Sequence, residues 1–172
     1  MGRWTREELE NAFDAYKAAA LKGGTTGDWT EWANCFTEDC TYKEHLYGEI
    51  GGRAAVLAWI TEVCANTYPG NEMPHFPIEW HIIDEERGWI VCQVWNRMRD
   101  PGDGSIHQEY NFTLLKYAGS HQFSYEEDIY NPAAFGTMLA GWETRRDKIA
   151  AKLSTLGGSL TPDDILDRAT TQ

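Results

Sequence analysis

The sequence predicts a single α+β domain, in which three or four helices wrap a curved, mostly antiparallel sheet to form a cone. The first observation is length, because 172 residues suffice for one domain with a substantial core. The second is apolar spacing typical of helices in the first third of the chain and again near its end. The third is a middle region of closely spaced strand-like runs, and this segregation of helices from hairpin-linked strands is typical of an α+β layout.

The first helix begins after Thr5, because Thr5 and Glu8 have the spacing of a capping box. Its apolar face includes Leu9, Phe13 and Tyr16, and we expect Gly23-Gly24 to end it. A second, shorter helix is expected after Asp28, with a turn at residues 37–39 behind it. A short strand over residues 40–45 and a third helix after Gly51-Gly52 follow.

The middle of the chain has the period of β-strands. Four strands are predicted at about 76–84, 88–98, 105–117 and 121–130, with short turn clusters between them, which predicts an antiparallel meander. Asn131 and Pro132 then have the residue types of a helix cap and first helical position. We expect this last helix to break at Gly157-Gly158, which divides the chain into a domain over 1–154 and a polar tail over 155–172.

Charge and composition exclude several classes of partner. The formal net charge of −12 argues against nucleic acid and anionic membranes, since both bind basic surfaces. No apolar run approaches the roughly 20 residues of a membrane span. The N-terminal residues lead into an amphipathic helix rather than a signal-peptide core, so we predict a cytoplasmic protein. The four cysteines form no CxxC motif, and in such a protein we expect them to be free thiols.

Aromatic residues make up 13% of the chain, which fits either a large core with a dimer face or an aromatic ligand pocket. The two interpretations are compatible. The strand over 88–98 is apolar on both parities, with Trp89 and Val91 on one and Ile90 and Cys92 on the other. A sheet buried on both faces in so small a domain predicts that a second copy covers one face, as in a homodimer.

Several segments resemble the nuclear-transport-factor-2-like superfamily, and within it the SnoaL-like branch of polyketide cyclases and ketosteroid-isomerase relatives. The resemblance covers about residues 6–150. The segments that carry it are Ala15-Tyr16-Lys17-Ala18-Ala19-Ala20-Leu21, Gly27-Asp28-Trp29, Phe36-Thr37-Glu38-Asp39-Cys40, Tyr42-Lys43-Glu44-His45-Leu46-Tyr47-Gly48, Gly52-Arg53-Ala54-Ala55-Val56 and Glu127-Asp128-Ile129-Tyr130-Asn131-Pro132. It implies a cone-shaped fold, which hosts many activities as well as non-enzymes.

The resemblance to ketosteroid isomerases assigns roles at single positions. Tyr16 falls where that family has a tyrosine that donates to the substrate oxygen, and His45 falls at its carboxylate base. Asn111 falls at its second oxyanion donor, and related dehydratases that pair a histidine with a carboxylate imply Asp128 as the partner of His45. Two of the three isomerase residue types differ, so the resemblance does not imply steroid isomerisation itself.

The altered set still supports acid–base chemistry. A histidine titrates near neutrality, and amide and phenol groups donate to a developing oxyanion. Each candidate also has a structural interpretation: His45 at a solvated strand end, Tyr16 in the core, Asn111 on the opposite sheet face, and Asp128 at the surface. The substrate-binding candidates are Trp32, Tyr42, Trp59, His81, Asn96 and Tyr130.

The leading hypothesis is a cofactor-independent lyase, dehydratase or isomerase acting on a small apolar ring compound that carries a hydroxyl or carbonyl. No sequence pattern indicates a metal site, a phosphate loop or a nucleophile elbow. The alternatives are a non-catalytic binder of small molecules, a dimerisation module with an incidental cavity, and an epoxide-hydrolase-like enzyme. The last rests on Arg97, Arg99 and Asp100, which also fit an exposed hairpin tip beside a Pro-Gly turn.

Overall fold

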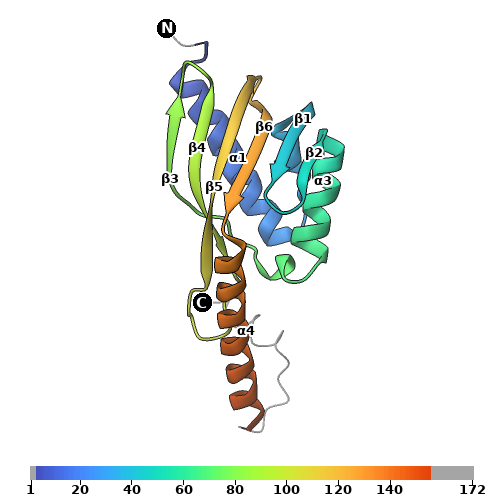
Figure 1. Cartoon of the computed structure of the whole chain (residues 1–172), viewed down its shortest axis with the longest axis vertical. Helices are drawn as coiled ribbons and strands as arrows, with labels where there is room; N and C mark the ends of the chain where they lie inside the picture. Colours follow the sequence, from blue (N-terminus) through green and yellow to red (C-terminus); the bar gives the residue numbers. More distant parts are fainter. Residues whose placement is uncertain (1–2, 156–172) are drawn as a thin grey trace.

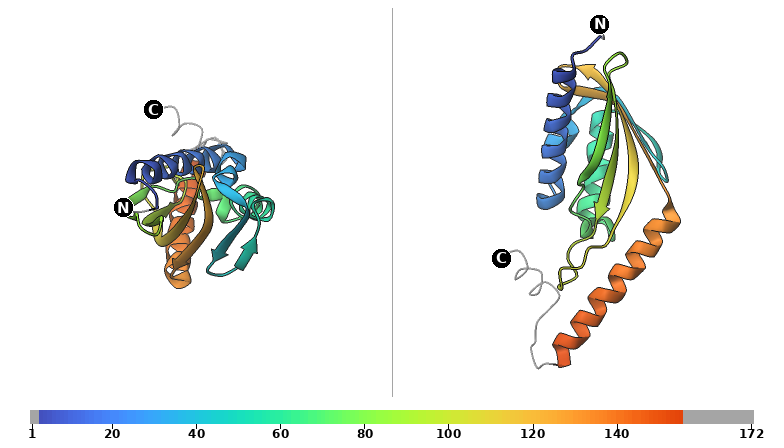
Figure 2. Two further views of the ribbon diagram at one scale, coloured as in Figure 1. Left: turned by 90° about the horizontal axis from the view of Figure 1, so that it is seen from above. Right: turned by 90° about the vertical axis from the view of Figure 1, so that its left-hand side faces the viewer.

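The computed structural model describes residues 3–155 and confirms the α+β class. Six strands form one mixed sheet in the order β2-β1-β6-β5-β4-β3. Helices α1, α2 and α3 lie on one side of this curved sheet, and α4 leaves its end (Figure 1, Figure 2). The elements, in chain order, are α1 (Arg6–Thr26), α2 (Thr30–Asn34), β1 (Phe36–Glu44), β2 (Gly48–Gly51), α3 (Arg53–Thr61), β3 (Ile78–Asp84), β4 (Trp89–Arg97), β5 (Gln108–Gly119), β6 (Gln122–Tyr130) and α4 (Pro132–Thr155).

Helix α1 begins as predicted, because the Thr5 side chain accepts a hydrogen bond from the Glu8 N–H. The prediction that Gly23-Gly24 ends it is wrong, since the helix continues to a left-handed Gly27. Both glycines are contact points instead. A Cβ on Gly23 would lie 2.6 Å from the Trp29 ring, and one on Gly24 would lie 2.1 Å from the Pro74 carbonyl oxygen. Tertiary packing therefore explains these glycines better than helix termination.

Strand β1 is longer than predicted, and the turn expected at residues 37–39 lies within it. The register with β6 shifts between Phe36 and Thr41, so a bulge accommodates these turn-forming residues while the strand continues. Strand β2 was not predicted and pairs antiparallel with the end of β1, from Thr41 opposite Gly51 to Glu44 opposite Gly48. His45 therefore lies in the tight connection of a hairpin.

Strands β3 to β6 form the predicted antiparallel meander, and β1 adds to β6 in parallel. This register places Tyr42 beside Glu126, and Thr113 beside Asp128. Alternate side chains of each strand face the helices, where Ile90, Cys92 and Leu115 are fully buried. The four cysteines are free thiols.

The outer face of the sheet carries large apolar side chains without a cover. Trp80, Ile82, Val91, Phe112 and Ile129 are all at least 36% exposed and come from four adjacent strands. Several are neighbours in the register, such as Ile82 with Val91 and Phe112 with Ile129. These five residues are called the outer apolar face below.

Helix α4 begins at Pro132 as predicted, with the Asn131 side chain accepting from the Ala133 N–H. It does not wrap the sheet and instead runs beyond the end of the domain (Figure 2). Trp142 is the buried residue of its apolar stripe, and its indole N–H donates to the Arg99 carbonyl. The predicted break at Gly157-Gly158 and the tail lie outside the described residues. Within 3–155, no helix combines the length and the hydropathy of a membrane span.

Candidate active site

A cavity of about 300 Å³ lies between the inner face of the sheet and the helices. Its sheet wall comes from β1, β4, β5 and β6 with the first residue of β3, and its helix wall from α1, α2 and α3 with the segment that follows α3 and the first turn of α4. Leu46 and Tyr47 line it too, although they are 64% and 62% exposed, so they form its rim. A cavity of this size accommodates a small ring compound.

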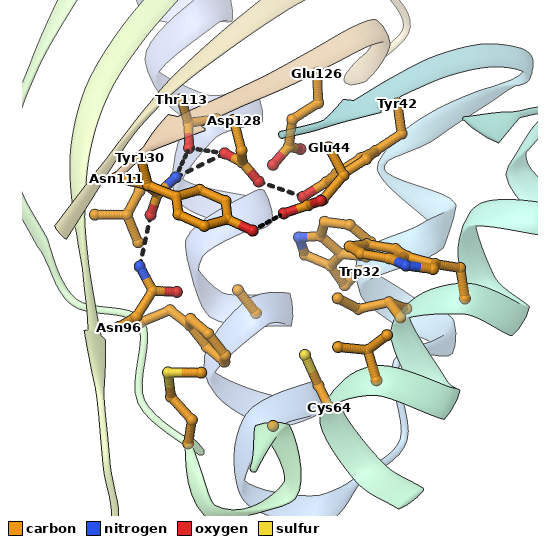
Figure 3. A pocket seen from close by; sticks show the side chains of 18 of the residues that line it. Trp32, Tyr42, Glu44, Cys64, Asn96, Asn111, Thr113, Glu126, Asp128 and Tyr130 are labelled. Carbon is orange, nitrogen blue, oxygen red and sulfur yellow. Dashed lines mark hydrogen bonds between the residues drawn. The ribbon is translucent and has the colours of Figure 1, made fainter. Parts of the chain in front are cut away.

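Asp128 is the most strongly held group of the sheet wall (Figure 3). Its Oδ1 accepts from the Asn111 amide at 2.7 Å and from the Thr113 hydroxyl at 2.5 Å, and its Oδ2 accepts from the Tyr42 hydroxyl. Burial raises the pKa of Asp128 to about 6, against the opposing effect of these donors. Asp128 is therefore an oriented carboxylate that titrates close to neutrality.

Glu126 lies two residues earlier on the same strand face and has a different environment. It is 2% exposed and accepts one hydrogen bond, from the Tyr16 hydroxyl to Oε1 at 2.9 Å. Its Oε2 is buried and has no hydrogen-bond partner among residues 3–155. Burial, reinforced by the charge of Asp128, raises the pKa of Glu126 well above its usual range. A carboxyl oxygen that lines a cavity without a partner is available to a ligand.

Glu44 supplies a third carboxyl group but is fully engaged by the protein. Its Oε2 accepts from the backbone N–H groups of Leu46 and Tyr47 at 2.6 and 2.7 Å. Its Oε1 accepts from the Tyr130 hydroxyl at 2.5 Å. Glu44 therefore holds the rim of the cavity in place.

The helix wall is aromatic. The rings of Trp32 and Trp59 flank Tyr42 with centroid distances of 6.0 and 4.9 Å. The indole N–H of Trp59 is buried and has no hydrogen-bond partner. The cavity thus has a carboxyl-rich sheet wall and an apolar helix wall whose free polar groups are uncharged donors.

The structure brings most of the predicted site residues together at this cavity. The predicted site residues that line it are Tyr16, Trp32, Tyr42, Trp59, Asn96, Asn111, Asp128 and Tyr130. Asn96 joins the sheet-wall network by donating to the Asn111 side-chain oxygen at 2.7 Å. Tyr16, predicted to face a substrate oxygen, donates to Glu126 instead.

The two predicted histidines are not brought into the cavity. His45 is exposed in the β1–β2 connection, and its ring lies against Tyr130 from outside. His81 is exposed on β3 beside Phe13. Neither imidazole lines the cavity, because His45 lies in the exposed hairpin connection and His81 lies against Phe13, further along β3 than Ile78, the β3 residue that does line it.

Sequence reasoning missed Glu126, Thr113 and Glu44. A signal was available, since side chains two residues apart share a strand face. If the Asp128 side chain faces inward, the Glu126 and Tyr130 side chains face inward as well. In the same way, Thr113 shares a strand face with Asn111. Strand parity would therefore have completed the set.

The epoxide-hydrolase-like set does not assemble in the cavity. The Arg97 guanidinium donates to Gln108, Arg99 pairs with Glu72, and Asp100 accepts from the backbone of its own turn. This agrees with the hairpin-tip interpretation. Within the described part of the chain, no group of three or more His, Cys, Asp or Glu side chains is arranged to hold a metal ion.

The fold and the cavity define a class of protein, the cone-shaped nuclear-transport-factor-2-like domains. Residues 12–114 match the SnoaL-like domain family, and the chain belongs to that family. No curated protein is detectably similar in sequence.

Solved structures confirm the fold at low sequence identity. A candidate isomerase from Bacillus subtilis has a TM-score of 0.58 and 13% identity, over 78% of this chain and 94% of its own. A nuclear-transport-factor-2-like protein from Anabaena variabilis has a TM-score of 0.58 and 14% identity, over 76% and 96%. A candidate SnoaL-like polyketide cyclase from Jannaschia sp. CCS1 has a TM-score of 0.54 and 14% identity, over 77% and 91%. At such identities the likeness shows the fold alone.

Proposed function

We propose that the cavity is the active site of a cofactor-independent acid–base enzyme of the lyase or isomerase type. The substrate class is a small, largely apolar ring compound with a hydroxyl or carbonyl. The observation that carries this proposal is Asp128, a cavity-lining carboxylate oriented by three donors, whose pKa burial raises to about 6. A general base is most effective when its pKa lies near the working pH.

The proposed step is proton transfer from a ring carbon to Asp128. The electron pair of the C–H bond moves toward the adjacent carbonyl, whose oxygen becomes an oxyanion. Transfer of that proton from Asp128 to a neighbouring hydroxyl, which then leaves as water, would complete a dehydration, and return of the proton to another carbon would complete an isomerisation. The apolar helix wall favours this chemistry because exclusion of water strengthens every electrostatic contact at the reacting atoms.

Donors for the developing oxyanion come from two sources. The unpartnered Trp59 indole N–H is one. The others are Tyr42 and Asn111, which donate to Asp128 in the free protein. When Asp128 takes up the proton its charge disappears, so these donors can turn to the oxygen that gains charge. We assign Tyr16 to positioning Glu126, because its hydroxyl donates to that carboxyl group.

The experiment is exchange of ring C–H protons for deuterium in D₂O, followed by NMR with ring ketones such as 2-tetralone. This readout detects proton abstraction even though the natural substrate is unidentified. Asp128→Asn should lower enzyme-dependent exchange by about 100- to 10 000-fold, the usual contribution of a general base. His45→Ala should change it little, because His45 is outside the cavity.

Glu127→Gln is the matched control, since Glu127 neighbours Asp128 but pairs with Lys43 on the outer face. The proposal fails if Asp128→Asn exchanges protons as fast as the parent, or if His45→Ala abolishes exchange. Binding of the ketones with no exchange in any of them would favour the alternative function, a non-catalytic binder. The dimerisation-module alternative predicts a filled cavity, which the volume of about 300 Å³ does not support.

We further propose that the protein acts as a homodimer through the outer apolar face, because a second copy would supply a matching apolar surface. An isologous pairing of this kind buries the same patch on both subunits. We expect neither nucleic acid nor membranes as partners, because the formal net charge of the protein is −12. The four free thiols favour a reducing compartment, which supports a cytoplasmic location.

A further inference from the structure

The charged side chains around the cavity are unbalanced. Three carboxyl groups line it, those of Glu44, Glu126 and Asp128. Among the described lining residues, Lys17 is the one basic side chain, and its ammonium group pairs with Asp14 at 2.7 Å and lies over the Phe13 ring. An anionic ligand would therefore find no cationic partner at the sheet wall.

The hydroxyl and amide donors of the sheet wall do not correct this imbalance. The hydroxyls of Tyr16, Tyr42 and Thr113 and the amide of Asn111 all donate to carboxyl oxygens of Glu126 or Asp128. Glu126 is nevertheless left with Oε2 buried and unpartnered, and its carboxyl group points into the cavity (Figure 3). In the ionised form of Glu126, the group that completes this oxygen must be a hydrogen-bond donor or a positive charge.

The aromatic walls favour a positive charge. Trp32, Tyr42 and Trp59 line the same space that the carboxyl groups border, and their rings lie close together. Aromatic faces attract cations electrostatically, and tryptophan does so most strongly. Rings on one side and an unpaired carboxyl group on the other are together the environment that an ammonium group prefers.

We propose that the ligand of this cavity carries a basic nitrogen, whose cationic form lies between the Glu126 carboxylate and the rings of Trp32, Tyr42 and Trp59. The inference rests on the proposed function for the location of the site and adds the chemical class of the substrate, an amino-substituted ring compound. Asp128 keeps its role as the base, and Glu126 is the recognition residue.

Ligand binding is then coupled to ionisation of Glu126. Its pKa in the free protein is raised by burial and by Asp128, and a bound cation would favour loss of the proton from this carboxyl group. Affinity for a permanent cation should therefore rise with pH. The titratable groups that interact with Glu126 from the surrounding elements are Tyr16, Cys35, Cys40, Tyr42, Cys92 and Asp128. Burial raises the pKa of the cysteine and tyrosine groups, which therefore remain neutral, so Asp128 and Glu44 are the other carboxyl groups of the cavity.

The test is a binding series with compounds that share one ring and differ in charge: benzylamine, benzyltrimethylammonium, benzyl alcohol and benzoate. Calorimetry gives the affinity, and NMR signals of the indole N–H groups locate the site. We expect the two cations to bind at least about tenfold more tightly than benzyl alcohol, and benzoate to bind least. Benzyltrimethylammonium, which is charged at every pH, should bind more tightly as pH rises from about 5 to 8.

Glu126→Gln should remove most of the preference for cations and leave only the part of the pH dependence that Asp128 contributes, while Glu127→Gln should leave both as in the parent. Equal or tighter binding of benzyl alcohol or benzoate overturns the inference, as does a Glu126→Gln variant that keeps the preference. If Glu126→Gln does not fold, the charge series and the pH series on the parent protein decide the matter alone.

The outcome is separable from that of the proposed function. If deuterium exchange into ring ketones depends on Asp128 but cations bind no better than neutral compounds, the proposed enzyme function stands and the proposal of a basic nitrogen in the ligand fails. If cations bind tightly but no proton exchange is detected, the proposed recognition site stands and the proposed catalysis fails.

Discussion

Glu126 and Glu127 are adjacent in the sequence and identical in type, yet they lie on opposite faces of β6. Glu126 faces the cavity, where burial raises its pKa well above the usual range. Glu127 faces outward, where hydrogen bonds from Lys43 and Tyr125 lower its pKa. The two faces differ in the same way along the strand, because Asp128 is inward and Ile129 is 54% exposed outward.

The difference shows how the fold concentrates polar groups on the side where they are costly. Carboxyl groups on the inner face lose hydration and are retained with tyrosine, threonine and asparagine donors. The outer face, which has solvent available, is largely apolar across β3 to β6. Such an inversion is typical of functional sites, where burial of ionisable groups opposes stability.

The largest effect expected from this contrast is the pH dependence of stability due to Asp128. Its pKa rises from 3.8 to about 6 on folding, so the folded state holds the proton more tightly than the unfolded state. This contribution is fully present below pH 4 and is lost as pH rises through 6, to a total of about 3 kcal/mol.

Urea unfolding of the parent and of Asp128→Asn between pH 4 and 8 measures this contribution as a difference. The unfolding free energy of the variant should increase relative to that of the parent as pH rises from 4 to 6. A constant difference between the two proteins would show that Asp128 has an ordinary pKa in the folded state.

The next effect concerns the outer apolar face. Phe112→Glu places a charge at its centre, beside the Trp80 and Tyr110 rings. We expect this substitution to weaken self-association by at least about 30-fold, the effect of removing one central anchor residue. Sedimentation equilibrium over a range of concentrations measures the change.

The control is Leu21→Glu, because Leu21 is 58% exposed on α1, away from this face. It should self-associate like the parent. A parent protein that is monomeric at all concentrations would refute the homodimer, and equal weakening by both variants would assign the effect to charge rather than to the face.

The last effects come from neutralising the two neighbouring glutamates, and they should have opposite signs. Burial raises the pKa of Glu126, so Glu126→Gln should raise the unfolding free energy, increasingly as pH rises. Glu127→Gln loses an exposed pairing with Lys43 and should lower it by at most about 1 kcal/mol. Thermal and urea unfolding at pH 5, 7 and 8 would test both, and a matching sign would contradict the two-face description.

Much of the fold was predictable because its signals are local. The Thr5 cap, the Asn131-Pro132 helix start and the turn clusters of the meander depend on residues close in sequence, and the structure confirms them. The Gly23-Gly24 prediction failed because its signal is not local. The reason for those glycines is a ring and a carbonyl from later segments, which no pattern within the helix reveals.

The sequence by itself determined the order of most elements, the family resemblance and eight of the residues that line the cavity. Only the tertiary structure decided which strand parity faces inward, since a shift of one residue exchanges the two faces of a strand. That choice brought Glu126 and Thr113 beside Asp128 and left His45 outside. The physical reason is that strand register and helix packing together set which side chains lose water, and loss of water is what changes the chemistry of a carboxyl group.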